Sequence, residues 1–100
     1  MLLHWAISEI IVSGAHNVTI DGDDRMTVPQ FRVTSINGVI PENVTIKNCI
    51  IDNSIDVQYV DNLLIDNNTF DGIAATSSPS HGRAIYFDNG ESSNVTISNN

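Results

Sequence analysis

Charged side chains of alternating sign occupy one position of a repeated phrase. Asp21, Lys47 and Asp66 each follow a short alternating segment, and Ser98 takes the same place in a fourth copy. If the copies stack as neighbouring strands about 4.8 Å apart, the two carboxylates lie roughly 10 Å apart with the ammonium between them. Inverting glycosidases hold two carboxyl groups about 6.5–9.5 Å apart, so this row could be catalytic. Because Lys47 would lower the pKa of both carboxyl groups, a charge ladder that stabilises the sheet is the competing interpretation.

A group of acidic residues follows the first copy, in the turn Asp21-Gly22-Asp23-Asp24-Arg25. Oxygen ligands suit a hard cation, so Asp21, Asp23 and Asp24 are candidate ligands for calcium. The turn does not complete the twelve-residue helix-loop-helix calcium pattern, because no glutamate follows at the required place. A solvated acidic turn is the alternative.

A long insertion at residues 72–82 ends in Ser80-His81-Gly82-Arg83. Its small and polar residues predict a surface loop, and long loops on a rigid scaffold are where function concentrates. His81 can act as a base near neutral pH, and Arg83 can neutralise a carboxylate, with Asp88 nearby. A turn in which His81 and Arg83 satisfy backbone carbonyls is the alternative.

An internal repeat predicts the elements that position these residues. Asn-Val-Thr-Ile occurs at residues 17–20, 43–46 and 94–97, and Asn-Leu-Leu-Ile occurs at residues 62–65. Aliphatic residues alternate within each copy, which predicts a short half-buried strand followed by a bend at Gly22, Asn48, Asn67 or Asn99. The sequence between the copies predicts further strands at residues 31–36, 49–51, 55–60 and 84–87 and little helix. Before the first copy, a capping helix and a strand at residues 10–12 are alternatives.

This pattern resembles the right-handed parallel β-helix repeat of pectate-lyase-like proteins, over about residues 9–100. The resemblance is carried by Asn43-Val-Thr-Ile-Lys-Asn48, Asn62-Leu-Leu-Ile-Asp-Asn67-Asn-Thr-Phe70 and Asn94-Val-Thr-Ile-Ser-Asn-Asn100. It implies an all-β fold, a right-handed parallel β-helix (solenoid) of about four to five coils. It also implies inward aliphatic stacks and an asparagine ladder at Asn48, Asn67 and Asn99, from which Gly22 departs in the first copy.

The same resemblance implies an extracellular or cell-surface protein that binds a polysaccharide along an outer sheet groove, as a polysaccharide lyase or glycoside hydrolase. The catalytic candidates are then His81, Arg83 and Lys47, and the substrate-binding candidates are Asp21, Asp66 and Asp88. The alternative is a non-catalytic β-helix, such as an adhesin or a phage tailspike-like glycan-binding or structural module, because no complete catalytic signature is present.

Length and composition limit the number of domains and the class of partner. A chain of 100 residues predicts one domain, with helical spacing at residues 1–10 that would suit an N-terminal cap. The chain stops inside the turn after the fourth copy, so we expect a C-terminally truncated β-helix whose open ends can self-associate.

The net charge of −8 disfavours nucleic acid and anionic membranes, and no apolar run reaches membrane-spanning length. An acidic polysaccharide would need calcium to bridge the carboxylates, whereas a neutral glycan would not. Cys49 is the only cysteine, which excludes an internal disulfide and predicts a small packed side chain.

Overall fold

The computed structural model describes residues 9–70, 85–87, 90 and 92–99, and every regular element among them is a β-strand. The strands are β1 (Ile10–Ser13), β2 (His16–Asp21), β3 (Thr27–Thr34), β4 (Glu42–Lys47), β5 (Ile50–Val57), β6 (Val60–Asp66), β7 (Thr69–Phe70), β8 (Ile85–Phe87) and β9 (Ser92–Ser98). All pairs between these strands are parallel. The predicted all-β class is therefore confirmed, while most of the expected cap at residues 1–10 lies outside the described residues.

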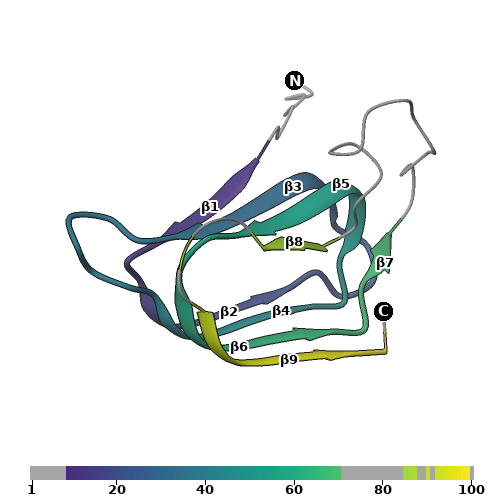
Figure 1. Ribbon diagram of the computed structural model, residues 1–100. Coiled ribbons are helices and arrows are strands. Elements are labelled where there is room, and N and C mark those ends of the chain that lie inside the picture. Colours follow the sequence, from purple (N-terminus) through teal and green to yellow (C-terminus); the bar gives the residue numbers. More distant parts are fainter. Residues whose placement is uncertain (1–8, 71–84, 88–89, 91, 100) are drawn as a thin grey trace.

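The chain passes back and forth between two sheets (Figure 1). Sheet A has the order β1-β3-β5, with β7 and β8 both pairing with β5, and sheet B has the order β2-β4-β6-β9. In sheet B the copies stack in the register that the repeat predicts. One column contains Val18, Val44, Leu63 and Val95, and the next contains Ile20, Ile46, Ile65 and Ile97.

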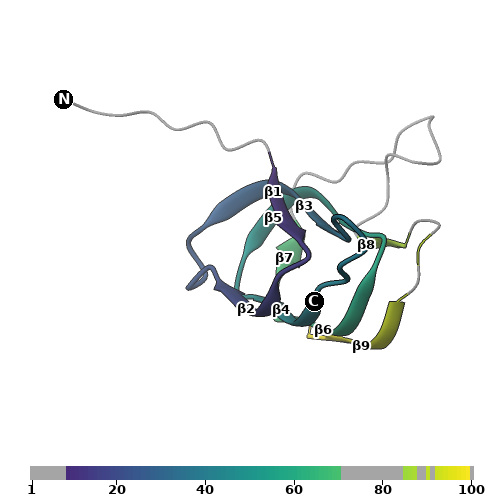
Figure 2. The same cartoon turned by 90° about the vertical axis from the view of Figure 1, so that its left-hand side faces the viewer.

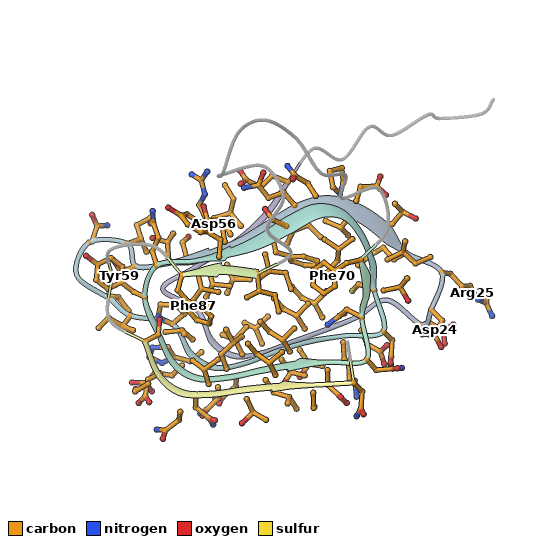
Figure 3. All side chains as sticks on the ribbon, turned by 45° about the vertical axis from the view of Figure 1, so that its right-hand side comes forward. Asp24, Arg25, Asp56, Tyr59, Phe70 and Phe87 are labelled. Atoms are coloured by element: carbon orange, nitrogen blue, oxygen red, sulfur yellow. The ribbon has the colours of Figure 1, made fainter. Side chains whose placement is uncertain are left out.

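The core lies between the two sheets, which Figure 2 shows on opposite sides of the molecule. Inward side chains from both sheets fill this space in Figure 3. Burying an aliphatic or aromatic side chain contributes about 1.5–3 kcal/mol, so these stacks are the main stabilising force. The buried residues are Val12, Val28, Phe31, Val33, Val44, Ile46, Cys49, Ile51, Ile55, Val57, Val60, Leu63 and Ile65. The burial of Cys49 confirms that it is a packed side chain.

The bends after the sheet B strands use left-handed backbone at asparagine but not at glycine. Asn48, Asn67 and Asn99 have φ angles of 56°, 56° and 55°, as predicted. Gly22 is not among the positive-φ residues, so the expected reason for this glycine was wrong. A Cβ at Gly22 would lie 2.5 Å from the carbonyl oxygen of Asn48. The glycine is needed because two backbones approach closely there.

Strand boundaries differ from prediction where proline and turn residues intervene. The strands predicted at residues 49–51 and 55–60 are joined across residues 52–54 in β5, which ends at Val57, and Val60 is the first residue of β6. The strand predicted at residues 31–36 is β3, which begins four residues earlier and ends at Thr34. The register of β3 shifts between Val28 and Gln30, on either side of Pro29, which has no N–H to donate to the ladder.

Candidate functional site

The row of charged residues predicted after the repeated phrase exists on sheet B. Asp21 is the register partner of Lys47, Lys47 of Asp66, and Asp66 of Ser98. The row therefore lies at the end of the four strands, one residue per strand. This geometry supports the expected order of charges, and the catalytic role of Lys47 stays a prediction.

Hydrogen bonds hold the pKa of both carboxyl groups in this row below the usual value of 3.8. Asp21 Oδ1 accepts a bond from Asn48 Nδ2 at 2.9 Å, the main cause of its lowered pKa, and a second from the backbone N–H of Asp23 at 3.0 Å. Asp66 Oδ1 accepts from Ser98 Oγ at 2.8 Å and from Asn99 at 3.1 Å. The charge of Lys47 also lowers the pKa of both aspartates, but it is the smallest of the causes.

A general acid needs a raised pKa, so these two carboxylates are suited to accept hydrogen bonds and not to donate protons. The sequence analysis was therefore correct that Lys47 lowers the pKa of both carboxyl groups. The larger cause of the lowered pKa is the neighbouring amide and hydroxyl donors, which depend on side-chain contacts between adjacent strands.

The predicted asparagine ladder is present in part. Asn67 Nδ2 donates to Asn48 Oδ1 at 2.7 Å, and Asn48 Nδ2 donates to Asp21 Oδ1. The carboxylate of Asp21 is thus the acceptor at the first position of the ladder, where Gly22 has no side chain. Asn99 leaves the ladder and donates to Asp66.

A second asparagine ladder, which was not predicted, runs along the opposite end of the sheet B strands. Asn43 Nδ2 donates to Asn17 Oδ1 at 2.9 Å, and Asn62 Nδ2 donates to Asn43 Oδ1 at 2.7 Å. Their φ angles are 60° for Asn17, 55° for Asn43 and 68° for Asn62. The signal was the first letter of the repeated phrase, which is asparagine in every copy. Both ends of these strands are therefore fixed by side-chain bonds.

The acidic turn does not bring its three carboxylates together. Asp23 forms an ion pair with Arg25 at 3.4 Å, in which both side chains are at least 80% exposed, and Figure 3 shows Asp24 and Arg25 at an outer corner. Within residues 9–70, 85–87, 90 and 92–99, no three His, Cys, Asp or Glu side chains are grouped so that they could hold a metal ion. Calcium binding by Asp21, Asp23 and Asp24, and its alternative of a solvated turn, stay predictions.

The insertion at residues 72–82 lies outside the described residues, and so do His81, Arg83 and Asp88. Their predicted roles stay predictions. Lys47, Asp21 and Asp66 are the members of the predicted site that the structure brings together.

A hollow of about 610 Å³ lies where β4, β6 and β9 begin, at the other end of these strands from Lys47 and Asp66. It is lined by Ile40, Glu42, Val60, Asp61, Gly90, Ser92 and Ser93. Glu42 and Asp61 are register partners, and Ser93 Oγ donates to Asp61 Oδ1 at 2.8 Å. These residues were missed, although the residue before each repeated asparagine marks the row, which is His16, Glu42, Asp61 and Ser93.

The outer face of sheet A carries an ion-pair cluster that was also missed. Arg32 Nε lies 3.4 Å from Glu9 Oε2 and 4.0 Å from Asp56 Oδ2, and Asp56 is labelled above β5 in Figure 3. Arg32 and Asp56 are register partners on β3 and β5. The cluster joins neighbouring strands, and we assign it a structural role.

The chain matches no protein-family model, and neither the curated proteins nor the solved structures contain a similar one. In the part of the chain that the structure describes, no helix is long and apolar enough to cross a membrane.

Proposed function

We propose that this chain is a right-handed parallel β-helix domain that binds an extracellular polysaccharide along the outer face of sheet B. The observation that supports this most is a shallow hollow of about 250 Å³ on β4 and β6, lined by Asn43, Val44, Thr45, Asn62 and Leu64. Amide and hydroxyl groups beside an aliphatic side chain can hydrogen-bond sugar hydroxyls and contact the apolar face of the ring.

The repeat extends this surface beyond one sugar unit. Neighbouring strands are about 4.8 Å apart, so successive units would meet equivalent side chains. The outward row through the hollow consists of Thr19, Thr45, Leu64 and Thr96. A neutral glycan fits better than a uronate polymer, because Lys47 is flanked by two carboxylates and the chain carries a net charge of −8.

Binding is tested by titrating ¹⁵N-labelled protein with neutral tetrasaccharides, and with uronate oligomers with and without calcium. We expect amide shifts confined to β4 and β6. Thr45→Val removes one hydroxyl and should weaken binding roughly three- to tenfold. Thr27→Val removes an exposed hydroxyl on sheet A and should change nothing. The absence of shifts with every oligosaccharide, or equal losses in the two variants, would refute the proposal.

Catalysis as a polysaccharide lyase or glycoside hydrolase is separated from non-catalytic binding by a product assay. The lowered pKa of Asp21 and Asp66 favours the non-catalytic alternative for this row, because neither carboxyl group holds a proton at neutral pH. Unsaturated product from a uronate polymer would support the lyase, and should disappear in His81→Ala and Arg83→Ala. Activity that survives both substitutions would exclude these residues as the catalytic pair.

A further inference from the structure

A short apolar hairpin projects from the connection between β3 and β4 (Figure 1). Ile36 and Val39 exchange both backbone N–H···O bonds, at 3.0 and 2.8 Å. Between them, Asn37 and Gly38 have φ angles of 52° and 78°, the backbone of a tight type I′ turn. Ile36, Val39 and Ile40 are 50%, 45% and 37% exposed. The hairpin thus exposes three aliphatic side chains within five residues, and exposed apolar patches can mark interaction sites.

The patch continues through Ile40 into the 610 Å³ hollow at the start of β4, β6 and β9. This volume lies within the range of about 300–1,000 Å³ that is usual for ligand pockets. One wall is fixed by backbone contact, because a Cβ at Gly90 would overlap the carbonyl group of Gln58. At the base of the hairpin, a Cβ at Gly14 would lie 2.6 Å from Ile36 Cγ2. Close packing on these two glycines gives the surface a defined shape.

The hollow carries acidic side chains, whereas the hairpin carries aliphatic ones. Glu42 and Asp61 face the hollow from adjacent strands, and the carboxylate of Glu42 has neither a hydrogen-bond nor an ion-pair partner within the described ranges. Lys47 lies five residues further along β4, roughly 16 Å away. The complementary group is therefore a cation carried on an aliphatic stem.

We propose that the hairpin and the hollow together dock a segment of a partner protein in which a lysine or arginine stands between aliphatic residues. The cationic group lies between Glu42 and Asp61, and the flanking aliphatic side chains cover Ile36, Val39 and Ile40. A bare metal ion does not fit, because the described residues contain no group of three ligating side chains. The site uses different side chains from the proposed polysaccharide surface, so either proposal can fail without the other.

The test is a fluorescence anisotropy titration with a fluorescein-labelled peptide that has one lysine between two leucines. The comparison peptide carries Nε-acetyl-lysine, which keeps the stem and removes the charge. Glu42→Gln combined with Asp61→Asn should weaken binding of the lysine peptide about tenfold, and the loss should shrink at high salt. Asp24→Asn combined with Asp52→Asn is the matched control. Both residues are exposed, and this double variant also removes two negative charges. Ile40→Ser tests the aliphatic contact and should also weaken binding.

Preference for the lysine peptide, lost in the hollow variant and kept in the control, would establish the site. Equal binding of the two peptides would overturn the proposal, and so would equal losses in the two double variants, since binding would then follow net charge only. Binding of an amino-sugar oligomer in the absence of peptide binding would assign the hollow to a glycan and would also overturn it. Thermal unfolding of each variant shows whether a lost signal reflects lost folding.

Discussion

Asn68 is a buried side chain whose removal tests how the bends after neighbouring strands of sheet B are held together. It is 4% exposed. Its Oδ1 accepts a hydrogen bond from the backbone N–H of Cys49 at 3.0 Å, and its Nδ2 donates to the carbonyl of Ile46 at 3.1 Å. The amide therefore satisfies two buried backbone groups at the end of β4 and just after it, which water cannot reach.

Asn68→Ala leaves both backbone groups without this partner. Each buried unsatisfied group costs about 1–3 kcal/mol, so the expected loss in free energy of unfolding is about 2–4 kcal/mol. In a domain of this size the melting temperature should fall by roughly 10–25 °C. The matched control is Asn53→Ala. The side chain of Asn53 is exposed and has no hydrogen-bond partner among the described residues, so the change should stay within about 0.5 kcal/mol.

A second variant separates the hydrogen bonds from simple packing. Asn68→Asp keeps the acceptor for Cys49 but removes the donor to Ile46 and buries a carboxylate. Burial raises the pKa of that carboxyl group, and its protonated form can donate to the carbonyl, so the variant should regain stability as the pH falls. Urea unfolding followed by circular dichroism measures all three variants. Equal stability of Asn68→Ala and Asn53→Ala, or no pH dependence in Asn68→Asp, would refute the reasoning.

Three further predictions follow from the ladder, the charged row and the buried thiol. Asn48→Ala should cost about 1 kcal/mol more than Asn48→Gly in urea unfolding, because both lose the ladder bonds but only alanine is strained at a φ of 56°; equal costs would contradict the strain argument. The lowered pKa of Asp21 and Asp66 gives stability that is present above the usual value of 3.8 and is lost as the pH falls through the lower folded values. Asp21→Asn combined with Asp66→Asn should therefore flatten the fall in stability between about pH 5 and pH 2, and an unchanged slope would count against it. Burial raises the pKa of the Cys49 thiol, so Ellman's reagent should react slowly with native protein and fully in urea; rapid native reaction would show that the thiol is accessible.

The stacking of sheet B could be predicted because identical phrases impose identical registers. When Val-Thr-Ile recurs, only one alignment puts every aliphatic residue inside, and a slip by one residue would expose them all. The observed partners Val44 and Leu63, and Ile46 and Ile65, follow that alignment. The outward row of Asp21, Lys47 and Asp66 then follows from position alone.

The hairpin and the hollow could not be predicted from the repeat because they occur where the copies differ. The Asn-Gly pair at residues 37–38 is a hairpin-turn signal that lies outside the repeated phrase. Glu42, Asp61 and Ser93 are separated by 19 and 32 residues, so only the register brings them together. Gly90 contributes through a backbone contact with Gln58, which no residue pattern encodes.

The two ladders divide sheet B into surfaces that should act independently. Asparagines fix both ends of the strands, and the aliphatic positions between them face the core, which leaves three outward rows for recognition. The first row holds Glu42 and Asp61 and the last holds Lys47 and Asp66, roughly 16 Å apart along each strand. This distance is about twice the Debye length of about 8 Å at physiological salt, so the charges of one row are largely screened from the other. Asp21→Asn combined with Asp66→Asn should therefore leave peptide affinity unchanged. A tenfold change in peptide affinity in this variant would show that the two rows form one site, because screened charges at this separation cannot couple so strongly.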